Sequence, residues 1–356
     1  MIRPRQLARR ALLAGGGALF ISPLRAQPAF RPRPGAWRTF DLVTRLEPRA
    51  SGKAVRVWVP LPSFEAPDWQ RAAPPEWLGN AQTVERFWDT VSGAEILSFA
   101  WDAGARPATT LTIRVRTRDR AIGPPAPGRP PRLSETDRRR WTTRDAADPA
   151  VLARAREIAS GAGDDVARAL HLWVASEGRF DANARGRSPA SLAAENQPTG
   201  DAAALNGLFV ALARALEIPA RRLAGLRVAA SRFEFTSLGP NAADLSRAQH
   251  TRAEVWLAGS GWTAADPADA CRVRALEPRD NLGPGDARLV DLRAALFGAA
   301  ENNWIAFNAA DSLGLPGATR APLALFDRPV AETPDGPLPD DPDAFAYTLT
   351  AREIDG

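Results

Sequence analysis

The stretch from Gly200 to Arg221, GDAAALNGLFVALARALEIPAR, decides the fold. Residues 202–216 are apolar on nearly every side of a helix, which is typical of a helix buried in a domain core. Ile218-Pro219 ends it, because a proline disfavours helical backbone in the residue before it. Asp201 is of a type that caps helix N-termini. The stretch therefore predicts a central buried helix that begins at Ala202.

The segments around this helix predict an α+β core. A helical period of apolar residues runs from Pro149 to about residue 175. After the central helix, strand-like runs occupy residues 222–228, 250–257 and 262–266. A buried helix followed by strands indicates a helix packed on an antiparallel sheet.

The two ends of the chain predict further parts. Residues 35–120 form an N-terminal β region, since Leu111, Ile113 and Val115 alternate with polar residues and Val55, Val57 and Val59 recur with the same period of two. Residues 121–145 contain a Pro-rich connector, in which GPPAPGRPP cannot lie in a sheet or helix interior. Residues 276–356 form a C-terminal extension that packs on the core, with a helix near 289–297 and a last strand around Tyr347 and Leu349.

Four blocks follow one another around the central helix: Gly200-Asp201-Ala202, Ile218-Pro219-Ala220-Arg221, HTRAEVW from His250, and GWTAADP from Gly261. Their order and spacing resemble the transglutaminase-like superfamily, most specifically over residues 195–270. The resemblance implies a papain-type α+β fold over residues 146–275, with the central helix packed on an antiparallel sheet. It also implies the family activity, acyl transfer from a thiol or amide hydrolysis.

The family places three catalytic residues in these blocks. A cysteine lies at the N-terminus of the central helix, where the helix dipole favours the thiolate. A histidine at the start of one strand pairs with the thiolate, and an aspartate at the end of the next strand orients the imidazole. Carried over by position, the histidine is His250, the aspartate is Asp266, and the cysteine position is occupied by Ala202. A position that is often acidic in the family falls on Ala204.

Alanine has no nucleophile, so the sequence predicts a catalytically degenerate domain. The candidate ligand-binding residues lie beside the catalytic positions: Asp201, Arg252, Glu254 and Trp256. In a regular strand Arg252 and Glu254 share a face with His250, where they could line a cleft or pair on a solvated surface. Trp256 fits packing better than substrate stacking.

The hairpin between His250 and Asp266 decides whether these side chains meet. They are 16 residues apart, so they share a face if the turn is centred on Ala258 with an odd number of loop residues, or contains a bulge. A two-residue turn at Gly259-Ser260 would place them on opposite faces.

Other catalytic or metal chemistry has little support in the sequence. Cys271, the only cysteine, is expected on an exposed turn after Asp266, and its recruitment as nucleophile stays an alternative. A serine at 246 or 260 cannot be placed beside His250 from the sequence. With two histidines and no C-x-x-C pair, we expect no metal site and no cofactor.

The N-terminus predicts export to the periplasm or the exterior. Residues 1–26 have the order of a signal peptide, with a basic segment, a short apolar run and a small residue at a cleavage position. Arg9-Arg10 fits a twin-arginine signal, and an ordinary secretory signal fits equally. Removal of this segment leaves 41 basic and 41 acidic residues, which gives no support to a nucleic-acid partner. After cleavage no membrane association is expected.

Two classes of function follow. The first is a binding or scaffolding module for a peptide or cell-wall ligand. The alternative is an active amidase, peptidase or protein-crosslinking enzyme of the same superfamily that uses a different nucleophile. The sequence does not predict the ligand or the oligomeric state.

Overall fold

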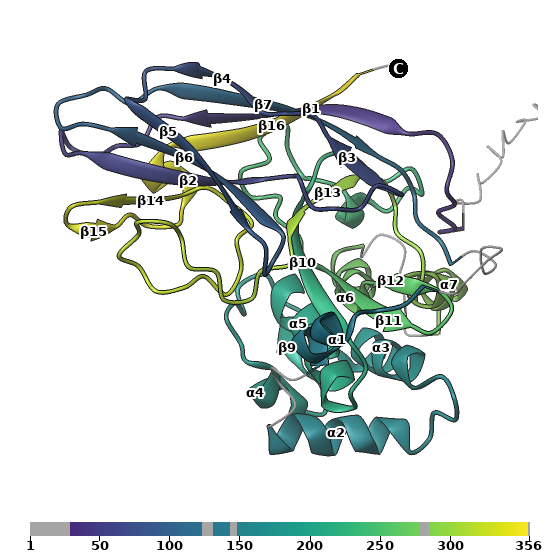
Figure 1. Ribbon diagram of the computed structural model, residues 1–356. Helices are drawn as coiled ribbons and strands as arrows, with labels where there is room; N and C mark the ends of the chain where they lie inside the picture. The colour runs from purple at the N-terminus through teal and green to yellow at the C-terminus, as the bar shows by residue number, and fades with distance from the viewer. Residues whose placement is uncertain (1–28, 123–130, 143–147, 278–282, 284, 355–356) are drawn as a thin grey trace, which may run out of the picture.

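The computed structural model describes residues 29–122, 131–142, 148–277, 283 and 285–354 (Figure 1). The predicted signal peptide lies outside these residues. The described part has a helical half around the central helix and a β-rich half of two sheets, which lie at the bottom and top of Figure 1. None of its helices is long and apolar enough to cross a membrane.

The central helix α5 spans Ala202–Ala215 and begins where the sequence predicts. Its residues from Ala204 onward are buried, and Asp201 caps it by accepting a hydrogen bond from the Ala204 amide. Helices α2, α3 and α4 pack around it, together with α6 and two short strands. Their bounds are α2 Pro149–Ala159, α3 Val166–Glu177, α4 Pro189–Ala193, α6 Pro267–Leu276, β8 Arg179–Phe180 and β9 Thr199–Gly200.

An antiparallel sheet with strand order β12-β11-β10-β13 packs on α5. Its strands are β10 Ala220–Arg227, β11 Arg252–Leu257, β12 Gly261–Ala265 and β13 Trp304–Asn308. One face carries small residues such as Ala253 and Ala265, which belong to the same apolar cluster as α5. The other face carries Leu223 and Trp304, which pack with aromatic residues of the β-rich half. This is the predicted α+β core.

The β-rich half consists of two antiparallel sheets that share one apolar core. The first has the order β16-β1-β7-β3, with β4 also paired to β7, and the second has the order β15-β14-β2-β6-β5. The strand bounds are β1 Arg38–Leu46, β2 Val55–Leu61, β3 Gln70–Ala72, β4 Glu76–Gly79, β5 Thr83–Asp89, β6 Ala94–Trp101, β7 Thr109–Thr117, β14 Val330–Thr333, β15 Gly336–Pro337 and β16 Tyr347–Ile354.

The C-terminal residues complete the β-rich half rather than forming a separate layer on the core. Strand β16 pairs with β1 along its length, and β14 pairs with β2. In the sequence, helix α7 Ala287–Ala295 follows α6, and helix α8 Pro342–Phe345 directly precedes β16. The helix expected near residues 289–297 is therefore present, and the last strand joins the first one.

The connector prediction needs a correction. Residues 123–130 lie outside the described part, but residues Glu135–Thr142 form helix α1, which the sequence reading missed. Ser134 accepts a hydrogen bond from the Asp137 amide, as an N-cap residue does. Trp141 of this helix is buried against Trp262. The helix forms because its single apolar anchor has an aromatic partner far away in the sequence.

Candidate functional site

His250 and Asp266 are in contact. His250 Nε2 lies 2.7 Å from Asp266 Oδ2, and both side chains are buried. The hairpin loop has three residues, 258–260, with Leu257 opposite Gly261, so the turn is centred on Gly259 rather than Ala258. Gly259 and Gly261 have φ of +87° and +76°, which suits glycine. An odd loop places the two side chains on one face, as the hairpin test requires.

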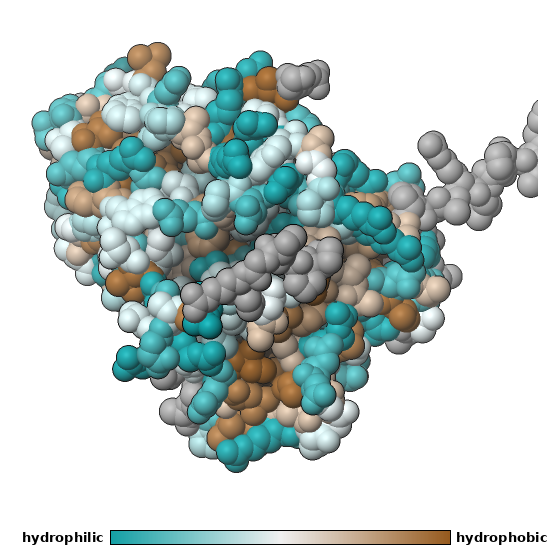
Figure 2. All heavy atoms as spheres, turned by 45° about the vertical axis from the view of Figure 1, so that its right-hand side comes forward, coloured by the Kyte–Doolittle hydropathy of each residue, from teal (hydrophilic) through white to brown (hydrophobic). Residues whose placement is uncertain are grey.

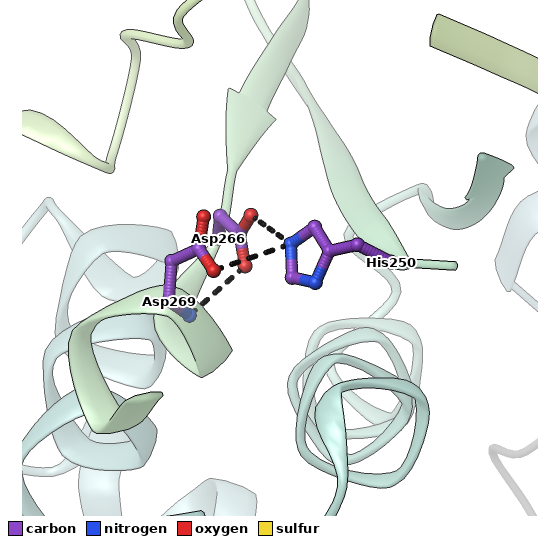
Figure 3. Close-up of side chains that lie close together, drawn as sticks. All are labelled: His250, Asp266 and Asp269. Carbon is purple, nitrogen blue, oxygen red and sulfur yellow. Dashed lines mark hydrogen bonds and ion pairs between the residues drawn. The ribbon is translucent and has the colours of Figure 1, made fainter. Parts of the chain in front are cut away.

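The pair belongs to a larger buried charge cluster. Asp269 Oδ1 lies 3.4 Å from His250 Nε2, and Asp269 also pairs with Arg227 of β10. Arg252 Nε lies 3.6 Å from Asp266 Oδ2. Figure 3 shows both carboxylates on the same side of the imidazole, at its Nε2 edge. Two arginines and two aspartates thus surround the ring, so their charges balance.

The electrostatics of the cluster keep the histidine neutral. Burial lowers the pKa of His250 well below its usual value, and the charge of Arg227 lowers it further despite the opposing effect of Asp269. Burial raises the pKa of Asp266, although Arg252 and Asn206 favour its ionised form. A neutral imidazole that bonds to a carboxylate through Nε2 carries its proton there. Its other nitrogen, Nδ1, is then an acceptor and faces away from both aspartates (Figure 3).

Asn206 joins α5 to this cluster. It is fully buried, and its Nδ2 donates to Asp266 Oδ1 at 3.0 Å and to the Thr251 carbonyl. Its Oδ1 accepts a hydrogen bond from the Ala268 amide at 3.2 Å. The sequence reading did not select Asn206, although a lone amide in an apolar helix is a signal that it bonds something buried.

Asp269 and Arg227 were also missed. Asp266 is the N-cap of α6, and its carboxylate accepts a hydrogen bond from the Asp269 amide. An aspartate three residues after an N-cap looks like ordinary capping chemistry in the sequence. Arg227 ends a strand and looks like a surface residue, yet it is buried. Only the tertiary fold brings them to His250.

Ala202, the residue predicted to occupy the family's cysteine position, lies at the N-terminus of α5. Ala202 is the first residue of the helix and is partly exposed. The neighbouring Asp201 has a raised pKa because it is partly buried, while its hydrogen bond from the Ala204 amide favours the ionised form. Its carboxylate therefore acts as a helix cap. A ligand role for Asp201 stays a prediction.

Cys271 does not lie on an exposed turn, as expected from the sequence, but inside α6 and almost fully buried. Its sulfur lies 3.3 Å from the Val174 carbonyl of α3. Burial raises its pKa to about 12, so the thiolate is suppressed. The position after Asp266-Pro267 is helical because Pro267 starts a helix that Asp266 caps.

Three acidic or histidine side chains of the described part could offer atoms to one ion. They are His250, Asp266 and Asp269, whose ligand atoms lie within 4.8 Å of one another. However, both carboxylates already interact with a positive charge, because Arg227 contacts Asp269 and Arg252 contacts Asp266. His250 also uses Nε2 for its bond to Asp266. The donor set therefore does not fit a metal ion.

The remaining predicted ligand residues divide into two groups. Arg252 is buried, donates to the Glu301 carbonyl at 2.9 Å and stacks on Trp304, so its role is internal. Glu254 and Trp256 instead border a cavity on the sheet face away from α5. Glu254 is buried between Arg120 and Arg221, at 2.7 and 2.6 Å. Burial raises its pKa, but these two arginines outweigh that effect and lower it.

We call this cavity the tryptophan groove. It has a volume of about 400 Å³ and lies between the β-rich half and the sheet β12-β11-β10-β13. Its side chains include Trp69, Trp256, Trp262, Arg120, Arg221 and Glu254. A second hollow of about 290 Å³ shares Trp262 and Arg221 and adds Trp88 and Trp141. In Figure 2, apolar side chains are visible on the lower, helical part of the face shown, bordered by hydrophilic ones.

The arginines of the groove are held in place by stacking. Arg221 lies 4.0 Å from the centre of the Trp262 ring, and Arg120 lies 4.6 Å from that of Trp69. Such cation–π contacts, together with the two ion pairs to Glu254, fix both guanidinium groups. The groove is thus a rigid wall of indole rings and arginines.

Comparisons with known proteins agree with the fold and the four sequence blocks. Residues 152–267 match the model of the transglutaminase-like superfamily. An uncharacterized protein of Haemophilus influenzae is 29% identical over 344 residues, which cover 89% of this chain and 90% of that protein. A candidate cysteine protease from Cytophaga hutchinsonii has a crystal structure with a TM-score of 0.52 and 12% identity, covering 91% of this chain and 93% of that chain.

The periplasmic domain of TgpA from Pseudomonas aeruginosa is also similar, with a TM-score of 0.33 and 14% identity, over 65% of this chain and 94% of that chain. The family match includes α5 and the hairpin, and it ends at Pro267 directly after Asp266. The chain therefore contains a domain, residues 152–267, that matches the transglutaminase-like superfamily.

Proposed function

We propose that the chain is an exported, catalytically inactive transglutaminase-like protein that binds an extended peptide. The proposal that the chain is catalytically inactive rests on one observation: Ala202 is the first residue of α5. A methyl group cannot attack a carbonyl, and the family chemistry needs a thiolate at that position. His250 and Asp266 keep their contact without a nucleophile to serve.

Substitutes for the missing thiol are poorly placed. Cys271, the only cysteine of the sequence, directs its sulfur to carbonyls of α3 and has a strongly raised pKa. Ser246 Oγ donates to Asp244 at 2.5 Å and accepts from the Leu349 amide, so it does not serve His250. Ser260 lies at the tryptophan groove. These contacts disfavour the alternative of an enzyme with a different nucleophile.

The tryptophan groove supports the proposal that the chain binds an extended peptide. Tryptophan and arginine dominate the energetics of protein recognition sites, and aromatic grooves accept extended, proline-containing peptides. A described residue of the chain itself, Pro131, already borders the groove. A Cβ atom on Gly261 would lie 3.4 Å from the Pro131 ring and 3.8 Å from Trp256, so the proline ring and the indole both lie beside Gly261.

Binding is tested with the mature chain and a fluorescent decaproline peptide, with purified cell-wall sacculi in a parallel pull-down. We expect saturable binding of the peptide that Trp256→Ala weakens by about tenfold, or 1.4 kcal/mol. The matched control is Trp77→Ala, which removes an exposed indole on β4 that is not among the residues lining the groove.

Equal binding by the Trp256 and Trp77 variants would exclude the groove as the peptide site. Retention by sacculi without decaproline binding would assign the protein to a cell-wall ligand, either a glycan or a stem peptide, instead. Robust turnover of amide substrates by the wild-type chain, abolished in His250→Ala, would overturn the proposal that the chain is catalytically inactive.

A further inference from the structure

A third cavity lies next to the buried charge cluster and is separate from the tryptophan groove and from the hollow beside it. Its volume is about 390 Å³. Arg227 connects the two: it pairs with Asp269 of the charge cluster, and it also lines the cavity. The other polar side chains that line it are Arg247, Arg272, Asn241, Asp244, Ser246, Gln249 and Asp343.

Most charges around this cavity are already paired within the protein. Arg227 pairs with Asp269 and donates to the Leu238 carbonyl. Arg247 lies 2.9 Å from both Asp341 and Asp343. These pairs leave one cation and one anion of the lining, Arg272 and Asp244.

Arg272 has no carboxylate partner among the residues that the structure describes. Its Nε donates to the Ser237 carbonyl at 2.7 Å, and its guanidinium lies 4.9 Å from the centre of the Phe180 ring. Burial and the nearby charge of Arg227 lower its pKa, and the charges of Asp269 and Asp266 oppose this effect. A carboxylate at this place would stabilise the charged guanidinium through charge-assisted hydrogen bonds.

Asp244 is the complementary group. Its Oδ1 accepts hydrogen bonds from the Ser246 amide at 2.8 Å and from Ser246 Oγ at 2.5 Å, which fix its orientation. Within the described part of the chain it forms no ion pair. The two unpaired groups therefore have opposite signs and line one cavity without pairing to each other.

We propose that this cavity binds a small zwitterion, a free amino acid or a short peptide, whose carboxylate contacts Arg272 and whose ammonium contacts Asp244. A ligand with both charges pairs with the partly buried Arg272 and the exposed Asp244 together, whereas a simple anion or cation pairs with only one of them. The cavity volume is large enough for a ligand of this class. This site is independent of the peptide groove and of any activity at Ala202.

The test is isothermal titration of the mature chain with glycine, dialanine and trialanine, in which the two charges are progressively further apart. Acetate and ethylamine serve as probes with a single charge. We expect at least one zwitterion to bind below about 10 mM and at least about tenfold more tightly than either single-charge probe. Arg272→Gln and Asp244→Asn should each weaken it by about tenfold or more.

Two controls separate recognition from folding. Arg272→Lys keeps the positive charge and should retain more affinity than Arg272→Gln, with unfolding midpoints compared in urea. Arg45→Gln alters a neighbouring hollow that also includes Asp244 but not Arg272, and it should leave binding unchanged. Trp256→Ala should also have no effect.

Three results would overturn the proposal. They are no binding by all three zwitterions, acetate binding as tight as the best zwitterion, or an equal loss in the Arg45 variant.

Discussion

Asn206 is the residue on which the geometry of the candidate site depends most. It bonds Asp266, the Thr251 carbonyl and the Ala268 amide from within α5. Thr251 directly follows His250, and Asp266 is the partner of His250. The side-chain amide of Asn206 thus fixes the positions of α5, the segment that carries His250 and the start of α6 relative to one another.

Asn206→Ala should therefore destabilise the fold. The change removes one of the hydrogen-bond donors to the buried Asp266 carboxyl group and the side-chain donor to the buried Thr251 carbonyl, which costs about 2 to 3 kcal/mol. Urea unfolding followed by circular dichroism measures it. Asn183→Ala, which removes an exposed amide, is the matched control and should change stability by less than about 0.5 kcal/mol. Equal effects of the two variants would contradict the role of Asn206.

His171 gives the stability of the protein a pH dependence. It is fully buried with its Nε2 3.0 Å from the Arg293 carbonyl, while its Nδ1 has no hydrogen-bond partner within the described part of the chain. Burial lowers its pKa to about 4. Between that value and about 6.5, the unfolded chain binds the proton and the folded chain does not, so stability is lost as the pH falls through this window.

His171→Gln should remove this contribution, which amounts to at most about 3 kcal/mol at neutral pH relative to pH 4. The comparison is the free energy of unfolding of both chains at pH 7 and at pH 4.5. The wild type should lose more stability than the variant, and parallel losses would show that His171 does not charge on unfolding. His250 remains in both chains and cancels.

At this scale the sequence predicted some residues of the site and missed others. Ala202, His250 and Asp266 were selected because family spacing marks them, and the structure brings His250 and Asp266 into contact. Asn206, Asp269 and Arg227 were missed because each takes its role from a partner at least 19 residues away. No local pattern carries that information.

Among the elements, strand β10 sets how closely the sheet packs behind His250. A Cβ atom on Gly225 would lie 2.2 Å from the Trp304 ring and 2.3 Å from the Ile305 carbonyl. Trp304 in turn donates its Nε1 hydrogen to the His250 carbonyl at 2.8 Å. The glycine is therefore required for close approach of β10 and β13, and not for an unusual backbone angle.

Gly225→Ala should destabilise the protein by about 1 to 3 kcal/mol, since the neighbouring indole and backbone must shift to accommodate a methyl group. Gly161→Ala is the control, because nothing lies within 4 Å of the added atom. Thermal unfolding compares the two variants with the wild type. A Gly225 variant as stable as the Gly161 variant would contradict the packing described for β10 and β13.

The elements also show where sequence patterns succeed. Helix α5 and the hairpin were predicted to within two residues, because their apolar periods are long and their ends carry proline or glycine. Helix α1 was missed, since its one apolar anchor, Trp141, gives no period. Cys271 was misplaced because capping by Asp266 outweighed the expectation of a turn after a strand.

The whole molecule is closed by its C-terminal strand. Strand β16 pairs with β1 from Leu46↔Tyr347 to Thr39↔Ile354, and Tyr347 and Leu349 are buried in the core of the β-rich half. Pairing between residues more than 300 apart has no signature in the sequence. The sequence therefore suggested an extension on the core where the structure has an integral strand.

Deletion of residues 347–356 should unfold or strongly destabilise the β-rich half. It exposes the β1 edge and removes two buried side chains, each worth about 2 kcal/mol. The near-ultraviolet spectrum and the urea midpoint of the truncated chain measure the effect. The β16 assignment would be wrong if the midpoint were unchanged.

The most direct test of the central claim is turnover by three purified chains: the wild type, Ala202→Cys and His250→Ala. The readouts are incorporation of a biotinylated amine into casein and hydrolysis of casein, with Cys271→Ser in the Ala202→Cys background to exclude the native thiol. We predict no turnover by the wild type or the His250 variant, because the attacking group is absent at the α5 N-terminus. Wild-type turnover that disappears in His250→Ala would contradict the account.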